Sequence, residues 1–432
     1  MDKGPRDGWM AEEENEVKKL SLAEWEAKYI VEKLEQFDQK HTMFERPGWD
    51  PDIHGAVESW AIRGTVSRKP GYRLEEWALH WASRRGTLMN FFNTSKPASG
   101  KEAKLLAKGL AGLETTLLAT ASQGPPPGAE LTSQDPEELS RTIKKAALWF
   151  GADMVGICRL DRRFLYSHVY DAMPYMGKGS DELVRGDSVP QEIPESYQWA
   201  VVMGFEQDYD LISRYPTFWS NAASSMGYSR LTITNHYLST FIRNLGFQAI
   251  DCAINDVALS IPLAMLAGLG DLGRNGLLIT PAYGPRVRIS QVLTDMPLVA
   301  DQPIDFGVTE FCEACEICAE KCPSQSILYG DRTAEPNNIS NAAGALKWPI
   351  NAETCRMYWG KINQGCTTCM AACPFNKLDT PFHRMVRWFV DHARWGDRFY
   401  VWMDKIMGYG RPRPVDHFWD EWKPGRRKGL FR

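Results

Sequence analysis

The sequence predicts an α/β fold that carries a separate cysteine-rich domain, and three observations support this. Predicted strands and helices alternate between about residues 136 and 280, which is typical of a sheet covered by helices. Eight of the ten cysteines gather between Cys312 and Cys373 in two short, similar patterns. The chain has 432 residues, which exceeds one typical domain and is long enough to bury a large core.

The composition along the chain predicts four units. The first ends in a polar linker rich in proline and glycine, and the third contains the cysteine cluster. They are an N-terminal unit at 1–135 with the linker at about 121–135, a core at 136–306 with an insertion at about 166–198, a ferredoxin-like domain at 307–376, and a C-terminal segment at 377–432 that completes the core.

Within these units, the order of elements follows from local patterns. Charged residues with apolar ones at helical spacing predict a surface helix from about Glu12 to Gln39. Asp135 as N-cap, followed by proline and two glutamates, predicts a helix from 136 to about 150. Further along we expect strands at 153–160, 199–206, 247–252 and 277–280, and helices at 217–244 and 258–267.

Charge and hydropathy argue against two classes of protein. The net charge is −4 and the pI is about 6.1, so no nucleic-acid partner is indicated. No apolar run reaches the roughly 18 residues that a spanning helix requires. The first ten residues contain no apolar segment that could serve as a signal peptide, so the protein either stays inside the cell or has lost a leader.

The cysteine spacing predicts two [4Fe–4S] clusters. Cys312, Cys315, Cys318 and Cys322 form a C-x2-C-x2-C-x3-C run followed by proline, which is the bacterial ferredoxin pattern. The second set is Cys355, Cys366, Cys369 and Cys373, again followed by proline, with its first ligand further upstream. In such runs the fourth cysteine ligates the other cluster. We therefore assign the cysteines as two crossed sets: Cys312, Cys315, Cys318 and Cys373 hold one cluster, and Cys322, Cys355, Cys366 and Cys369 hold the other.

Two other uses of cysteine were weighed. Zinc sites employ paired C-x2-C motifs, but the third cysteine of each run and the trailing prolines argue against zinc. Disulfides would not repeat this spacing. Cys158 and Cys252 lie outside both runs, and we expect them to be buried as small apolar residues.

A glycine-rich segment, GlyLeuGlyAspLeuGlyArgAsnGly at 268–276, precedes an apolar strand. Glycines in such a place let a backbone approach a ligand closely, so Gly270, Arg274, Asn275 and Gly276 are candidate cofactor-binding residues. A plain tight turn would explain the same pattern, and the spacing alone does not separate the two.

In combination, these motifs resemble those of the corrinoid- and iron–sulfur-dependent reductive dehalogenases. The match includes the glycine-rich segment continued to Pro281, TyrGlyProArgValArg at 283–288, GlyTyrSerArg at 227–230, Asn255–Asp256 and the two-cluster module. The resemblance extends from about residue 136 to 380. It implies a nitroreductase-like α/β core that binds a cobalamin-type corrinoid base-off, with clusters that pass electrons to cobalt. The sequence contains no Asp-His-x-x-Gly motif, in agreement with a corrinoid that has no histidine ligand.

The resemblance also implies a substrate, partners and a location. We expect a small organohalide, with chlorinated alkanes or alkenes favoured, and a respiratory enzyme in its mature form. Expected partners are a small membrane-anchor subunit, a quinol-derived electron donor and a second copy in a homodimer. The location would be the outer face of the cytoplasmic membrane, after removal of a twin-arginine leader that this chain does not contain.

By the same resemblance, three residues fall on catalytic positions. Tyr228 corresponds to the proton donor, Arg288 to its helper and Asn255 to a residue near the substrate. A tyrosine with its ordinary pKa of about 10 is a slow acid–base partner at neutral pH, and a nearby guanidinium stabilises the phenolate. Without the family match, each has a simpler explanation: core packing, a surface ion pair or a helix cap. Trp359 and Tyr358 are expected to line the pocket, and core packing would explain them too.

Two other functions remain open. Epoxyqueuosine reductase shares the corrinoid core and the ferredoxin module but acts on tRNA with an aspartate acid, and Asp256 lies next to the relevant position. A pure electron-transfer protein would leave about 300 upstream residues without a task.

Overall fold

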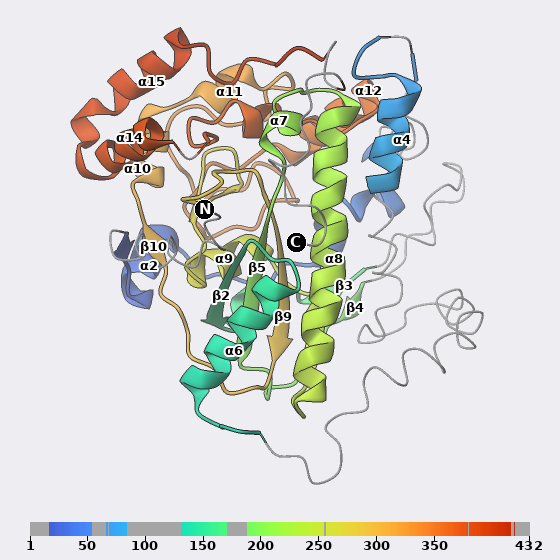
Figure 1. Ribbon diagram of the computed structural model, residues 1–432, viewed down its shortest axis with the longest axis vertical. Helices are drawn as coiled ribbons and strands as arrows, with labels where there is room; N and C mark the ends of the chain where they lie inside the picture. Colours follow the sequence, from blue (N-terminus) through green and yellow to red (C-terminus); the bar gives the residue numbers. More distant parts are fainter. Residues whose placement is uncertain are drawn as a thin grey trace, which may run out of the picture.

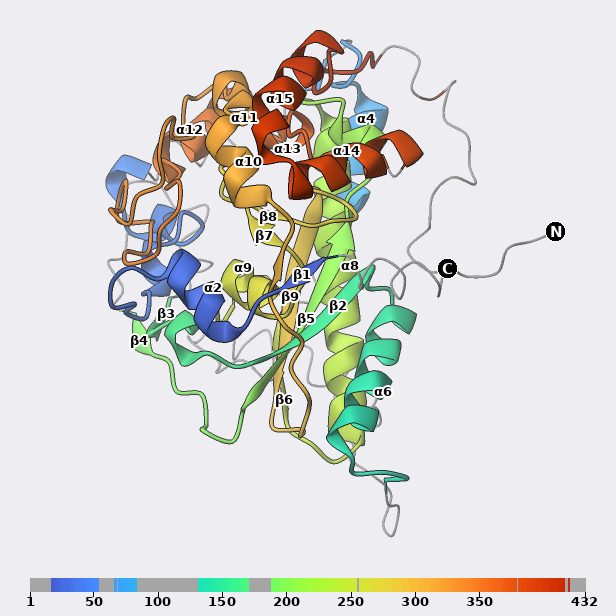
Figure 2. The same cartoon turned by 90° about the vertical axis from the view of Figure 1, so that its left-hand side faces the viewer.

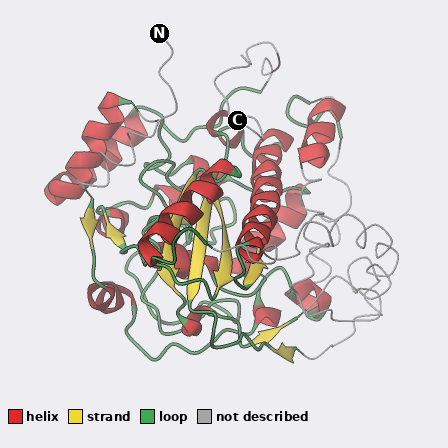
Figure 3. Ribbon diagram, turned by 60° about the horizontal axis from the view of Figure 1, so that its bottom comes forward, coloured by secondary structure: helices red, strands yellow, loops and turns green. Residues whose placement is uncertain are grey.

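The computed structural model describes residues 17–53, 66–67, 69–83, 131–170, 188–254, 256–378, 380–415 and 419. Its centre is a four-stranded sheet in the order β2 (Met154–Arg159), β5 (Trp199–Glu206), β9 (Val287–Thr294) and β6 (Ala249–Cys252). Every neighbouring pair in this sheet is antiparallel. Helices lie on both of its faces (Figures 1 and 3), so the predicted α/β core is confirmed.

Two helices cover one face of the sheet. These are α6 (Pro136–Trp149), which begins at the predicted Asp135 cap, and the long α8 (Phe218–Asn244). Side chains of both helices pack with the sheet in one core cluster, which includes Ile143, Met203 and Leu238, none of them exposed. Helix α8 runs along the whole sheet and continues toward the cysteine-rich domain (Figure 2).

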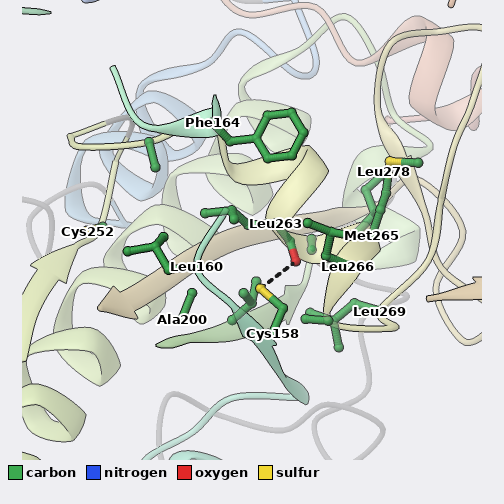
Figure 4. Packing of buried hydrophobic residues seen from close by; sticks show 14 of the residues in the cluster. Cys158, Leu160, Phe164, Ala200, Cys252, Leu263, Met265, Leu266, Leu269 and Leu278 are labelled. Atoms are coloured by element: carbon green, nitrogen blue, oxygen red, sulfur yellow. Dashed lines mark hydrogen bonds between the residues drawn. The ribbon is translucent and has the colours of Figure 1, made fainter. Parts of the chain in front are cut away.

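The opposite face is covered by α9 (Ser260–Leu266) and by α2 (Leu22–Tyr29) from the N-terminal unit. At Gly156 a side chain would bring its Cβ within 2.1 Å of the Ala267 carbonyl oxygen, so glycine permits the close approach of the segment after α9. Cys158 and Cys252 are both buried in this core, as predicted, and the Cys158 thiol lies 3.5 Å from the Leu263 carbonyl oxygen (Figure 4).

The remaining N-terminal and core elements are short. They are β1 (Lys18–Lys19), the 3-10 helices Gln39–His41, Arg46–Gly48 and Arg162–Phe164, α4 (Leu74–Ser83), β3 (His168–Val169), β4 (Val189–Pro190), α7 (Tyr209–Ile212), β7 (Asp271–Leu272), β8 (Leu278–Ile279) and β10 (Ile304–Asp305).

The helices of the cysteine-rich and C-terminal regions lie together at one end of the sheet (Figures 1 and 2). They are α10 (Val308–Ala314), α11 (Ile317–Lys321), α12 (Ala352–Ile362), α13 (Thr368–Ala371), α14 (Pro381–His392), the 3-10 helix Arg394–Gly396 and α15 (Asp397–Ile406). None of the helices in the described part of the chain is both long and apolar enough to cross a membrane.

Two sequence expectations need correction. The surface helix predicted from about Glu12 to Gln39 is wrong for the described residues, which contain only the eight-residue helix α2. Ser21 caps the start of α2, and Ile30 ends it in an extended conformation. Trp25 and Tyr29 of α2 are buried, although the charged residues around them in the sequence suggested a surface helix. Strand β9 was not predicted, although it occupies an inner position of the sheet and carries Arg288.

Candidate iron–sulfur and catalytic site

The eight predicted cluster ligands gather into two groups of free thiols. Cys318 lies within electrostatic range of Cys312, Cys315 and Cys373, while Cys355 lies near Cys366 and Cys322. Cys369 adjoins both groups, with Cys366 as its strongest thiol neighbour. The fold therefore brings the cysteines together in the crossed arrangement expected from their spacing.

The thiols line a cavity and do not converge on a single metal ion. Cys312, Cys315, Cys318 and Cys373 line one cavity together with Phe311 and Phe375. Among the described residues, no three His, Cys, Asp or Glu side chains converge closely enough to hold a single metal ion. Such a wide set fits a cubane, because each thiolate of a cubane binds a different iron. Burial raises the pKa of Cys312 to about 11, so its thiol is protonated until iron displaces the proton.

The glycine-rich segment forms a hairpin whose tip reaches the first cavity. Strands β7 and β8 pair, and a Cβ at Gly270 would lie 2.2 Å from the Ile279 carbonyl oxygen. Gly276 has a φ of +69°, which glycine adopts without strain. The glycines thus shape a tight turn, and the turn places Arg274 and Asn275 in the cavity lined by Cys312, Cys315, Cys318 and Cys373.

Arg274 is a fully buried cation beside this cavity. Its Nε donates to the carbonyl oxygens of Cys312 and Cys315, each at 3.0 Å, and its Nη1 donates to Leu328 O at 2.8 Å. The guanidinium carbon lies 4.6 Å from the centre of the Trp348 ring. The Nδ2 of Asn275 is buried and has no hydrogen-bond partner among the described residues, so it remains available as a donor in the cavity.

Tyr228 and Arg288 meet where α8 crosses β9. The guanidinium carbon of Arg288 lies 4.5 Å from the centre of the Tyr228 ring. A Cβ at the neighbouring Gly227 would come within 2.9 Å of the Arg288 side chain, so glycine there allows the close contact. The Nε of Arg288 is buried and has no hydrogen-bond partner among the described residues. Asn255, the third predicted catalytic residue, lies outside the described residues.

Arg230, from the GlyTyrSerArg motif, connects α8 to the sheet. Its guanidinium donates to Asp153 Oδ2 and Gly151 O, at 2.8 and 2.9 Å, and thereby ties α8 to the edge of the sheet. Arg286 is likewise buried, paired with Glu206, and lies near the rings of Tyr209 and Tyr283. Only Arg288 of these three arginines lies over Tyr228.

The pocket candidates Tyr358 and Trp359 lie on α12, the helix that contains Cys355. Burial raises the pKa of Tyr358, and the Cys366 thiol nearby raises it further. Trp359 stacks with Arg356, whose guanidinium carbon lies 5.4 Å from its ring centre. Both residues thus lie close to the second set of cysteines.

Sequence reasoning missed the contribution of the N-terminal unit to this region. Helix α4 lies along α8, where His80 Nδ1 is 3.2 Å from Ser225 Oγ and Ser229 donates to Ser83 O at 2.6 Å. The Tyr72 hydroxyl accepts from Gln364 at 3.0 Å, close to Cys366 in the chain. The sequence of α4 contains no motif that we recognise, so its position along α8 could not be predicted.

Crossed ligation predicts that cysteines distant in sequence belong to one cluster. We expect Cys322→Ala and Cys369→Ala to remove the same cluster, and Cys373→Ala to remove the other. Iron analysis and EPR of each reduced variant would check this. Loss of the same cluster signal in Cys369→Ala and Cys373→Ala, which are neighbours in sequence, would contradict the crossed sets.

The position of Arg274 predicts an effect on reduction potential. Adding an electron makes a cluster more negative, and a buried cation favours that step, so Arg274→Gln should lower the potential of the cluster held by Cys312. An EPR-monitored redox titration would measure the shift. Arg332→Gln is a matched control. Arg332 lies over the same Trp348 ring at 5.9 Å and pairs with Glu313, as Arg274 pairs with Glu316, but it donates to the Lys28 carbonyl oxygen instead of the carbonyls of the cysteine run. Equal shifts in the two variants would refute the role of Arg274.

Comparison with known proteins agrees with this site. Residues 311–376 match the family model of a 4Fe-4S double cluster binding domain. Over 300 residues, 66% of this chain, the sequence is 38% identical to the tetrachloroethene reductive dehalogenase of Sulfurospirillum multivorans, and the match covers 60% of that protein. A shorter match, 30% identical over 126 residues, links 29% of the chain to 34% of an epoxyqueuosine reductase from Lactococcus garvieae.

The fold is shared with solved reductive dehalogenases. One of them, described as suggesting a mechanism for B12-dependent dehalogenation, has a TM-score of 0.66 and 21% identity, covering 94% of this chain and 52% of that one. The chain therefore spans about half to three fifths of the length of the relatives that it matches. In sequence the chain is similar to the tetrachloroethene reductive dehalogenases, and it shares the fold of the solved reductive dehalogenases.

Proposed function

We propose that this protein is a reductive dehalogenase that removes halogen, chloride in the favoured case, from a small organohalide. The observation that carries the proposal is the Tyr228–Arg288 pair in the core of a chain that also contains a double cluster domain. The names of its relatives support the same reaction class. Electrons would enter through the two [4Fe–4S] clusters and leave at a base-off corrinoid in the core.

Such a corrinoid supplies a strongly reducing cobalt centre that can break a carbon–halogen bond. The core contains a polar group that fits a polar cofactor. On the face of β9 that carries Arg288, the Oγ of the fully buried Ser290 lacks a hydrogen-bond partner among the described residues, although an unpaired buried hydroxyl is costly. Ser290 would hold the corrinoid from β9. Arg274 and Asn275, at the tip of the β7–β8 hairpin, would instead contact the first cluster.

Tyr228 would donate the proton that replaces the halogen. Its ring lies under the guanidinium of Arg288, and this positive charge would interact favourably with the anion left after donation. Arginine does not give up its own proton under these conditions, so its role is electrostatic. Asn255 would bind near the substrate, and Tyr358 and Trp359 on α12 would form part of the pocket wall.

We also propose a substrate class, partners and a location. Chlorinated alkanes or alkenes suit a pocket walled by aromatic residues, because small halocarbons bind through apolar contact. A small membrane-anchor subunit, a quinol-derived electron donor and a homodimer would complete the system. The enzyme would act at the outer face of the cytoplasmic membrane as a peripheral protein, after loss of a twin-arginine leader.

An epoxyqueuosine reductase activity is the second candidate, favoured by the shorter match and by Asp256. However, Asp256 Oδ2 accepts the backbone N–H groups of Ala253 and Ile254, at 3.1 and 3.4 Å, which ties this carboxylate to the loop before α9. A catalytic acid that also holds its own loop would have less freedom to reach a substrate, so we favour dehalogenation.

The deciding experiment supplies reduced viologen to protein reconstituted with both clusters and a corrinoid. We expect chloride release from chlorinated ethenes or ethanes, measured by ion chromatography, and no reduction of an epoxyqueuosine-containing tRNA stem loop. Reduction of the tRNA without halide release from any alkane, alkene or arene would reverse the assignment.

Tyr228→Phe tests the proton donor. The variant keeps the ring beneath Arg288 but loses the acidic hydroxyl, so we expect dehalogenation to fall by at least about 100-fold, the lower range for loss of a general acid. Cobalt and cluster absorption spectra should remain unchanged. Tyr237→Phe, on the same helix but with 40% of its residue surface exposed, is the matched control. Normal turnover in Tyr228→Phe would exclude Tyr228 from the mechanism.

A further inference from the structure

Helices α14 and α15 expose an unusual number of large apolar side chains. We call this set the aromatic face; it consists of Phe382, Met385, Trp388, Trp395, Phe399, Trp402, Ile406 and Met407. Trp395, between the two helices, is 90% exposed, and Ile406 is 62% exposed. Contiguous apolar surface of this kind marks an interaction site in a soluble protein.

The aromatic face does not arise from loose packing. The opposite side of the two helices is well buried: Val390 and Val401 belong to the core cluster that contains Cys312, Cys315 and Cys373. Phe389 of α14 stacks on Tyr400 of α15, with 6.4 Å between ring centres. The outward residues recur at helical spacing, at 382, 385 and 388 on α14 and at 399, 402 and 406 on α15. Each helix is therefore amphipathic, with an apolar stripe directed away from the core.

The charge of this region is opposite to that of the whole chain. Residues 380–415 contain seven arginines and lysines against three aspartates, although the complete sequence has a net charge of −4. Asp391, Asp397 and Asp404 are all half-buried or buried, whereas six of the seven cations are exposed. The exposed cations are Arg384, Arg394, Arg398, Lys405, Arg411 and Arg413. Three of them pair with carboxylates from other elements: Arg394 with Glu310, Lys405 with Glu320 and Arg413 with Asp210.

The aromatic face lies over the first cluster site. An apolar groove between α14 and α15, lined by Phe382, Val386 and Tyr400 among others, ends at Pro374 and Phe375. Pro374 directly follows the cluster ligand Cys373. The second set of cysteines lies on the other side, toward Tyr72 and Tyr358. The face thus adjoins the site of the first cluster.

We propose that the aromatic face binds the surface of an anionic phospholipid bilayer. Tryptophan at the level of the headgroups, with arginine and lysine around it, is the pattern of helices that lie in a membrane interface. A second copy of this chain is a poorer occupant, because a two-fold contact through this face would bring the exposed cations of both copies together. This inference deepens the membrane location proposed above and places the first cluster toward the lipid.

The test measures binding of the complete, cluster-loaded protein to vesicles by co-sedimentation. We expect binding to phosphatidylcholine vesicles that contain phosphatidylglycerol, weaker binding without it, and further weakening as salt screens the cations. Trp395→Ala combined with Trp402→Ala should weaken binding by at least about tenfold. Viologen-driven dehalogenation in solution should not change, since neither residue belongs to the catalytic or cluster site.

Trp149→Ala is the matched control, because Trp149 is 83% exposed but lies on α6 against the sheet. Its variant should bind vesicles normally. Absence of vesicle binding by the parent protein, or equal loss in the Trp149 variant, would overturn the proposal. So would a dimer, measured by analytical ultracentrifugation, that dissociates in the double variant while vesicle binding persists unchanged. Failure of vesicle binding with normal halide release would reject the membrane surface and leave the proposed reaction intact.

Discussion

The burial of one positive charge organises the junction between the sheet core and the cluster domain. Arg274 is completely enclosed, and a cation in that position must be satisfied by several acceptors. It finds them in the backbone carbonyls of Cys312, Cys315 and Leu328. These contacts hold the loop of the first cysteine run against the β7–β8 hairpin. The hairpin in turn takes its shape from glycines, so the position of the cluster depends on a turn that has no room for side chains.

A second buried network extends the same junction to the N-terminal unit. Asp271, at the start of the hairpin, accepts from the Tyr29 hydroxyl and lies 3.2 Å from the Lys28 ammonium, while Lys28 also approaches Asp305 at 3.3 Å. Burial raises the pKa of Asp271, and the nearby Lys28 opposes that rise. Thr309 of α10 completes the contact from the cluster domain. Three parts of the chain that are far apart in sequence thus meet at one carboxylate, which explains why α2 is buried despite its charged neighbours.

The contact between Tyr228 and Arg288 depends on a different constraint, the close crossing of α8 and β9. Gly227 removes the side chain that would collide with Arg288, and the guanidinium then lies on the ring of Tyr228. Helix α8 is fixed to the sheet by Arg230 and Asp153 and to the N-terminal unit by α4. A long helix held at several points keeps Tyr228 in register with the strand, and the same helix extends toward the second set of cysteines.

The sequence by itself determined the chemistry of the cluster domain and most of the core elements. Ligand spacing restricts which thiols can share a cubane. The apolar patterns of 199–206 and 217–244 are strong enough to predict a strand and a helix close to their observed bounds. The tertiary structure decided what local patterns do not contain. Strand β9 mixes polar and apolar residues although both of its faces are buried, so its sequence shows neither an alternating nor an apolar pattern. Helices α2 and α4 owe their positions to contacts with residues 242 and 146 positions away. The amphipathic face of α14 and α15 has the same origin: only packing on the first cluster site reveals which of its aromatic residues remain outside.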